Sequence, residues 1–464
     1  LATYGAGAVV LAGSNTHSGT TASGGGALVL ANTHALQNST LASAATFDDA
    51  EASHAFLLGG LSGSFNLALE DDAATPNPVA LTVGNNGSSS TQSGILSGGG
   101  SLAKTGGGTL TLSGANTYGG GTAVSNGALT ITAAGALGTG AVVNDAVLNL
   151  TAGNATYSGL ATALSGTGTV NVTLGSGSGS TYVTGDCSGF SGVWNVGMNG
   201  SGGKLQLNGA DNPAAVVNVL SNGTLWCNSG THDATAILFG GNTGESSGQL
   251  RLDSGATWAG PVFLAGDITD SSDGFFGPGT GTGVISGVIA DLNGPHSVEK
   301  RSTNFMAFYG TNTYAGATSV KGGGLFVNSL KNLGEPSSLG AATAASNNVV
   351  KLGSGSNSGR LIYVGTGDTT DRIIDLAGST SGGILEQAGS GLLKFTSDLS
   401  ISVTGNKSLS LDGSTDGAGE FVGVITNGIG STNGVTKSGT GTWTLSGANS
   451  YSGTTTLNAG KLIA

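Results

Sequence analysis

The chain has 464 residues, of which 88 are Gly and 7 are Pro; charged residues make up 9% of it, and the net charge is −12. So few Lys and Arg residues leave no basic stripe to neutralise phosphates, which argues against nucleic acid as a partner. No apolar run approaches the ~20 residues of a membrane-spanning helix, so we expect no membrane span in this segment. The apolar residues, 38% of the chain, come in short alternating runs, which favours a folded β protein over a disordered one.

Helical signals are weak along the whole chain, because Gly interrupts almost every window of ten residues and each Gly in a helix interior costs about 1 kcal/mol relative to Ala. The best helical candidate, residues 48–58, lacks a clear apolar stripe, and we expect at most a turn or two there. Strand-like runs closed by Gly, Asn, Asp or Ser recur along the chain. In chain order, examples are residues 27–30, 109–112, 170–174, 204–207, 249–252 and 409–411.

Strand spacing alone fits a sandwich, a barrel or a solenoid. One segment of about thirty residues recurs four times without a gap in its alignment, and this repeat favours a solenoid. The copies are residues 1–30, 101–131, 297–327 and 434–464. Their unequal spacing indicates a recurring coil type within a longer run of coils. Each copy reads strand, turn, strand, turn, strand, or roughly one coil of a solenoid plus part of the next. The sequence therefore predicts one continuous β-solenoid over residues 1–464, of about twenty coils at ~20–25 residues each.

The turns of the four copies share a recurring chemistry. A Gly ends one strand, where we expect a positive φ, and an Asn two residues later is expected to bond backbone or stack on neighbouring coils. The Gly residues are Gly13, Gly114, Gly310 and Gly447, and the Asn residues are Asn15, Asn116, Asn312 and Asn449. Each copy then has a ring beside the turn, at His17, Tyr118, Tyr314 and Tyr451.

The alternating runs also predict which side chains are buried. These are Leu110, Leu112, Leu129, Leu205, Leu207, Leu250, Leu252, Val320, Leu445 and Leu462.

The recurring residues resemble the autotransporter-associated β-strand repeat, also called the passenger-associated transport repeat. The second copy matches its pattern at Leu102, Lys104, Gly106, Gly108, Thr109, Leu110, Leu112, Gly114, Asn116, Tyr118, Gly120, Thr122, Val124, Gly127 and Leu129. The other copies depart from it at single positions, such as Thr3 for Lys, His17 for Tyr and Trp443 for Leu. The copies cover about a quarter of the chain. The resemblance implies a right-handed parallel β-helix that is exported and displayed as the passenger region at a Gram-negative-type cell surface.

This reading predicts an extracellular structural or adhesive surface protein that is not an enzyme and has no cofactor. The expected partners are further coils, placed end to end, and cell-surface glycans. The alternative is a carbohydrate-active enzyme, a polysaccharide lyase or hydrolase, on the same fold. Such an enzyme needs clustered carboxylates, or a base with calcium, on one face.

Two acidic clusters are candidates for such chemistry, and we interpret both as surface loops. One is Asp267, Asp270 and Asp273; the other is Asp368, Asp371 and Asp375, with Arg372 expected to pair locally. The five His residues show no metal-ligand spacing and are expected in solvated loops. Trp194, Trp226, Trp258 and Trp443, with Phe275 and Phe276, are expected to pack in the core or at coil edges more than on sugars. We therefore predict no catalytic, cofactor-binding or metal-binding residue.

The cysteines and the two ends of the chain leave alternatives open. Cys187 and Cys227 would lie two coils apart, about 10 Å, beyond disulfide reach, unless a long loop makes them neighbours. Leu1 and Ala464 both align with positions inside the motif, so open coil edges are expected at both ends. The chain would then be part of a longer passenger, or a subunit that stacks head to tail into a fibre.

Overall fold

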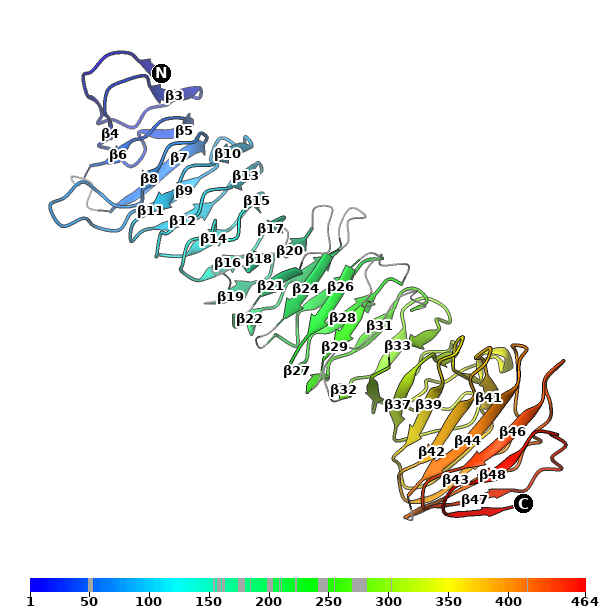
Figure 1. Ribbon diagram of the computed structural model, residues 1–464. Helices are drawn as coiled ribbons and strands as arrows, with labels where there is room; N and C mark the ends of the chain where they lie inside the picture. Colours follow the sequence, from blue (N-terminus) through cyan, green and yellow to red (C-terminus); the bar gives the residue numbers. More distant parts are fainter. Residues whose placement is uncertain are drawn as a thin grey trace. The chain divides into compact units, whose positions relative to one another are not determined.

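A computed structural model describes most of the chain (Figure 1). The residues described are 1–48, 53–152, 155–156, 160, 163–173, 180–183, 185–197, 203–207, 209, 211–221, 223–240, 249–253, 255–268, 282–301, 303–414 and 416–464. They form two compact units, Leu1–Asn218 and Val219–Ala464.

The first unit is built on parallel sheets in which each strand comes from a new turn of the chain (Figure 1). A ten-stranded sheet contains, in order, β1 (Ala2–Thr3), β3 (Thr20–Ser23), β5 (Leu36–Leu41), β7 (Ala55–Leu61), β9 (Ala80–Val83), β12 (Ser101–Lys104), β14 (Thr122–Val124), β16 (Val142–Asn144), β19 (Leu164–Gly166) and β22 (Gly189–Phe190). A second face orders β10 (Ser90–Gln92), β13 (Thr109–Leu112), β15 (Ala128–Ile131), β17 (Val147–Leu150), β20 (Thr169–Val172), β23 (Val193–Val196) and β25 (Val216–Val219). Shorter sheets contain β2 (Val9–Leu11), β4 (Leu28–Leu30) and β6 (Thr46–Phe47); β8 (Leu67–Ala68) and β11 (Leu96–Ser97); and β18 (Ala155–Thr156), β21 (Ser180–Val183) and β24 (Gly203–Leu207).

The second unit repeats this construction. Its ten-stranded sheet orders β27 (Gly230–His232), β30 (Ala256–Trp258), β32 (Thr282–Ile285), β35 (Phe305–Phe308), β37 (Gly323–Val327), β39 (Gly359–Tyr363), β42 (Gly383–Gln387), β44 (Lys407–Gly413), β46 (Asn433–Lys437) and β48 (Thr455–Leu457). Two further faces hold β34 (Val298–Lys300), β36 (Thr318–Val320), β38 (Val349–Leu352) and β41 (Ile373–Leu376), and β40 (Asp368–Thr370), β43 (Gly391–Phe395), β45 (Gly417–Phe421), β47 (Thr442–Leu445) and β49 (Lys461–Ile463). The remaining strands are β26 (Gly223–Cys227) and β29 (Leu250–Leu252), and β28 (Thr235–Leu238), β31 (Val262–Leu264) and β33 (Ile289–Asp291).

The predicted class, an all-β parallel solenoid, is confirmed. In the second repeat copy, Leu102 on β12 pairs with Thr122 on β14, so this coil spans 20 residues. Coil length varies more than the sequence suggested, since Gly323 on β37 pairs with Gly359 on β39, 36 residues later. The extra residues of that coil form a loop after β37, which includes the short 3-10 helix η3 (Ala345–Asn347).

Alternation along each strand places one row of side chains in the core. On β13, half-buried Thr residues alternate with buried Leu residues. The parallel register places Leu110 beside Leu129, and Leu129 beside Leu148 of the following coil. A row of apolar side chains thus continues from coil to coil. Burial of each Leu stabilises the fold by about 1.5–3 kcal/mol. Of the ten side chains predicted to be buried, nine are. Leu462 is half-buried, because β49 has a neighbouring strand, β47, on one edge only.

One local expectation, a positive φ at the strand-ending Gly residues, was wrong. At residues 48–58, where at most a turn or two of helix was expected, the described residues contain no helix and β7 begins at Ala55; residues 49–52 lie outside the described part. The strand-ending Gly114, Gly310 and Gly447 are not among the Gly residues with positive φ. They are needed for close approach: a Cβ at Gly114 would lie 2.3 Å from the carbonyl oxygen of Gly94 in the previous coil. Positive φ occurs instead in the later turn of the motif, at Gly127, Gly323 and Gly460.

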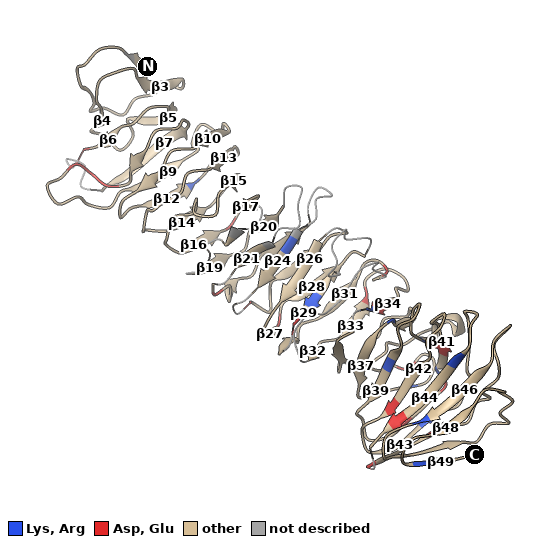
Figure 2. Cartoon of the chain, in the orientation of Figure 1, with Lys and Arg blue, Asp and Glu red and all other residues tan. Residues whose placement is uncertain are grey.

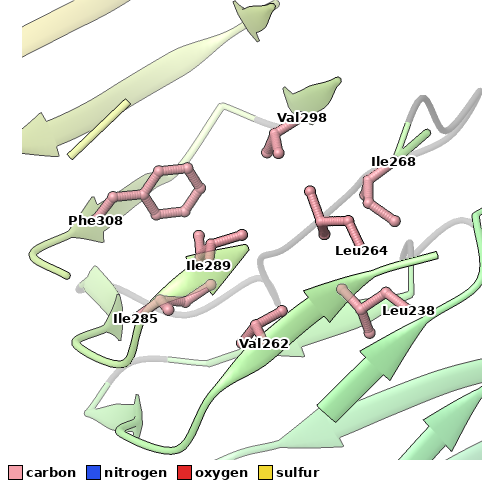
Figure 3. A pocket seen from close by; sticks show the side chains of 8 residues that line it. All are labelled: Leu238, Val262, Leu264, Ile268, Ile285, Ile289, Val298 and Phe308. Carbon is pink, nitrogen blue, oxygen red and sulfur yellow. The ribbon is translucent and has the colours of Figure 1, made fainter. Parts of the chain in front are cut away.

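A small apolar cavity of about 10 Å³ interrupts the core of the second unit. Figure 3 shows aliphatic side chains and one Phe facing it from several strands. They are Leu238, Val262, Leu264, Ile268, Ile285, Ile289, Val298 and Phe308. With this lining and a volume at the lower limit for one water molecule, the cavity is a packing defect and not a ligand site.

Candidate adhesive surface

The Asn residues of the repeat join three successive coils, which gives them a structural role. Asn116 is buried; its Oδ1 accepts a hydrogen bond from Leu96 N at 2.8 Å, and its Nδ2 donates to Ala136 O at 2.6 Å. Both partners are 20 residues away, one coil before and one coil after. Asn312 repeats the arrangement with Ile289 N at 2.8 Å and Ser338 O at 2.7 Å. The expectation that these side chains bond backbone of neighbouring coils is confirmed.

The Lys residues of the repeat have a role that the sequence did not reveal. Lys104 is buried, and its Nζ donates to Thr105 O (2.6 Å), Gly106 O (2.8 Å) and Asn126 O (3.2 Å), so it ties its own turn to the turn of the next coil. Lys437 donates in the same way to Ser438 O, Gly439 O and Ala459 O.

Lys300 binds Asn304 O (2.5 Å) and Gly322 O (2.7 Å). Its burial in the core lowers its pKa to about 7, because the interior disfavours the charged ammonium. The signal in the sequence was the recurrence of a Lys in an otherwise charge-poor motif.

The ring of each repeat bonds the Thr that opens the next strand. Tyr118 Oη lies 2.5 Å from Thr122 Oγ1, and Tyr314 Oη lies 2.6 Å from Thr318 Oγ1. In the first copy, His17 Nε2 lies 2.8 Å from Thr21 Oγ1, so the change of ring keeps the contact. The repeat residues described therefore stabilise the solenoid.

The acidic cluster of Asp368, Asp371 and Asp375 does not converge on one point. Asp368 bonds Lys331, Leu330 N and Tyr363 Oη; Asp371 accepts from Leu333 N and Asn348 Nδ2; Asp375 accepts from Ser402 N and Ser402 Oγ. Asp368 and Asp371 therefore both hold the loop at residues 330–333, and Asp375 holds a different segment at Ser402.

Arg372 was expected to pair with these carboxylates, and this was wrong. It is buried and donates to Gly340 O at 2.7 Å and Ser337 Oγ at 3.2 Å. Of the other cluster, Asp270 and Asp273 lie outside the described residues, and Asp267 accepts from Ser297 N at 2.8 Å. Among the residues described, no group of His, Cys, Asp and Glu side chains is placed to hold a metal ion.

The aromatic candidates pack as expected where they are described, and one His corrects the sequence analysis. Trp194, Trp258 and Trp443 are buried. Trp226 is covered by Arg251, whose guanidinium carbon lies 4.0 Å from the ring centroid. His232 was expected in a solvated loop, but it is buried and stacks on Trp258 with a ring-centroid distance of 5.8 Å. Phe275 and Phe276 lie outside the described residues.

Cys187 and Cys227 are both buried, and burial raises the pKa of the Cys187 thiol to about 12.

Charged side chains on the outer faces bind one another across coils. Figure 2 shows them scattered thinly over the sheets, with acidic residues of β42 and β44 side by side. Arg360 reaches along this row and bonds Glu386 at 2.5 Å and Asp412 at 2.8 Å. Lys394 pairs with Glu420 at 3.2 Å. These ion pairs neutralise much of the local charge on the outer face of the second unit.

The outer face of the first unit has a ladder of Asn amides. Asn149, Asn171, Asn195 and Asn218 point outward from consecutive coils, and each Nδ2 of the later three donates to Oδ1 of the Asn before it at 2.9 Å. Asn149 continues the row by donating to Thr130 Oγ1 at 3.1 Å. The amides are half-buried and fixed by one another. This ladder is polar, uncharged and periodic at the ~4.8 Å strand spacing.

The outer face of the second unit has a polar hollow of about 470 Å³. It lies where β42, β44, β46 and β48 begin, and its lining consists of hydroxyl, amide and Gly residues together with Lys407. The residues are Thr380, Gly382, Asn406, Lys407, Ser408, Thr432, Gly434, Thr436, Gly453, Thr454 and Thr456. No pattern in the sequence predicts this hollow, because its residues are 76 positions apart at the extremes and meet only through coil stacking.

These features define a class: a parallel β-solenoid with internally clamped repeats and polar, charge-poor outer faces. The family model of the passenger-associated-transport-repeat matches residues 4–30, 102–131, 306–325 and 435–464. The resemblance seen in the sequence is thereby confirmed, with a shorter match in the third copy.

The chain is also similar to the adhesin BmaC autotransporter of Brucella suis biovar 1 (strain 1330). The two are 30% identical over an alignment of 543 positions, which covers 93% of this chain and 16% of that adhesin. The chain thus spans about a sixth of the length of this relative. No solved structure matches. In the part of the chain that the structure describes, no helix has the length and hydropathy to cross a membrane.

Proposed function

We propose that this chain is an adhesive segment of a surface-displayed passenger on a Gram-negative cell, and that it is not an enzyme. The main support is the similarity to an adhesin autotransporter over 93% of the chain. The clamped repeats supply a rigid support, and the Asn ladder and the polar hollow supply outer faces that can form hydrogen bonds with a neutral partner. The carboxylates of Asp368, Asp371 and Asp375 are engaged in hydrogen bonds that hold backbone, the first two at residues 330–333 and the third at Ser402, which argues against the carbohydrate-cleaving alternative.

Adherence of cells that display the chain tests this proposal. The chain is displayed on a non-adherent Gram-negative host, and attachment to cultured host cells and to glycan-coated surfaces is counted. A host that displays an unrelated passenger of similar length is the control. We expect clearly greater attachment with this chain; attachment equal to the control would contradict the adhesive role. Turnover of a polysaccharide by the purified chain that is lost in Asp371→Ala would favour the enzyme instead.

End-to-end association with further coils, either of a longer passenger or of a second copy, remains a prediction. Edge strands present unpaired N–H and C=O groups that can pair with another strand. Light scattering of the purified chain over a dilution series tests for self-association, and negative-stain images test its direction. A mass that does not change with concentration would argue against assembly of copies.

A further inference from the structure

The hollow of the second unit is lined by two Gly residues stacked among hydroxyl residues. Gly382 and Gly434 lie in the lining together with Ser408 and Thr454. A Cβ on Gly382 would fall 1.7 Å from Ser408 O, and a Cβ on Gly434 would fall 2.7 Å from Thr454 O. Side chains at these positions would collide with the backbone of the neighbouring coil, so close packing of the coils requires Gly there. The volume of about 470 Å³ falls in the ~300–1,000 Å³ range of small-molecule sites.

The chemistry of the lining selects an uncharged, hydroxyl-rich ligand. Ser408 and Thr436 point their hydroxyls into the same row, with Oγ and Oγ1 3.0 Å apart, and each hydroxyl both donates and accepts hydrogen bonds. Asn406 Oδ1 accepts from Thr432 N at 2.9 Å, which fixes the amide at the rim. Of the described lining residues, only Lys407 has a charged side chain. It is buried, and its Nζ is bound to the carbonyl oxygens of Val403 and Gly405.

We propose that this hollow binds a short neutral oligosaccharide, with Ser408 and Thr436 as the side chains that hydrogen-bond its hydroxyl groups. The proposal rests on the adhesive role proposed above and names the class of ligand that one site on the adhesive segment binds. An anionic glycan finds no available cation in the lining. An apolar ligand could form no hydrogen bonds with the lining hydroxyls, which is unfavourable once the water that solvates them is displaced.

A glycan array and titration calorimetry test the proposal. Both measure binding of the whole chain to short neutral oligosaccharides and to sialylated versions of the same sugars. The double variant Ser408→Ala with Thr436→Val removes both hydroxyls with little change of shape. Thr456→Trp adds bulk from an exposed lining position and blocks the hollow if the double variant is poorly folded. Thr111→Val, on the outer face of β13 in the first unit, is the matched control.

We expect the unaltered chain and the control to bind a neutral oligosaccharide. The double variant and Thr456→Trp should bind it at least about tenfold more weakly, with melting midpoints near that of the parent. The proposal is overturned if no neutral oligosaccharide binds, if only sialylated ones bind, or if both variants bind as the parent does. Cell adherence measured on the same variants separates the two proposals. Adherence without binding in the hollow leaves the adhesive role standing, whereas no adherence by the unaltered chain contradicts that role itself.

Discussion

The side-chain oxygen of Asn116 accepts a hydrogen bond from the backbone N–H of Leu96, 2.8 Å away and one coil earlier. The amide nitrogen of the same side chain donates to the following coil, at Ala136 O. One buried side chain thus satisfies backbone groups of two other coils, which β-ladder bonds alone would leave unpaired at the turns.

Substitution Asn116→Ala should therefore lower the free energy of unfolding by about 2 kcal/mol or more, because it leaves a buried N–H and a buried C=O without partners at ~1–3 kcal/mol each. Urea unfolding followed by circular dichroism measures the effect. Asn449→Ala is the matched control, since Asn449 is half-buried and bonds Ile425 N at 2.9 Å. We expect a smaller loss there, and equal losses would show that the two-coil bridge adds nothing.

The buried Lys300 should make stability depend on pH. Its pKa is about 7 in the folded chain against 10.5 for an ordinary Lys, so between these values the unfolded chain binds a proton that the folded chain does not. Stability therefore rises with pH over this window and is flat below it. The unfolding free energy of the parent, relative to Lys300→Met, should increase from about pH 7 toward pH 10.5. Ser319→Ala on the adjacent β36 keeps Lys300 and should retain the slope of the parent. A constant difference between parent and Lys300→Met would contradict the lowered pKa.

The core cavity near Val298 and Leu264 predicts opposite effects of two substitutions. Val298→Ile adds one methyl group toward the empty space and should raise the free energy of unfolding by about 0.5–1 kcal/mol. Leu264→Ala enlarges the cavity and should lower it by about 2–5 kcal/mol. Thermal unfolding midpoints of the two variants check both signs. A destabilised Val298→Ile would mean that the cavity walls do not accept an added methyl group.

The outer Asn ladder predicts a modest but measurable cost for its interruption. Asn171→Ala removes the bond to Asn149 and the bond from Asn195, each 2.9 Å long. Because the amides are half-buried, we expect a loss of about 1 kcal/mol in the free energy of unfolding, at the lower end for two hydrogen bonds. Thr111→Val, on the same outer row of an earlier coil, should change stability less. An unaltered unfolding midpoint for Asn171→Ala would show that the Asn ladder does not stabilise the fold.

The sequence by itself determined the class of this protein, its strands and most of its core. Alternating runs such as residues 109–112 require one face to be buried, and four gapless copies of the same turns require stacked coils. Leu110 and Leu129 could be assigned to the core on this ground, since strand period and burial are local properties. The role of Gly114 could not be assigned correctly, because its neighbour, Gly94 O, belongs to another coil.

Only the tertiary structure decided which residues meet between coils. Coils differ in length, from 20 residues between Leu102 and Thr122 to 36 between Gly323 and Gly359, so the partner of a side chain lies at no constant distance in sequence. The carbonyl groups around Lys104, the separation of the Asp368, Asp371 and Asp375 carboxylates, and the hollow at Ser408 and Thr436 all depend on that register. The register is set by close packing of whole coils, a long-range property that composition and period do not contain.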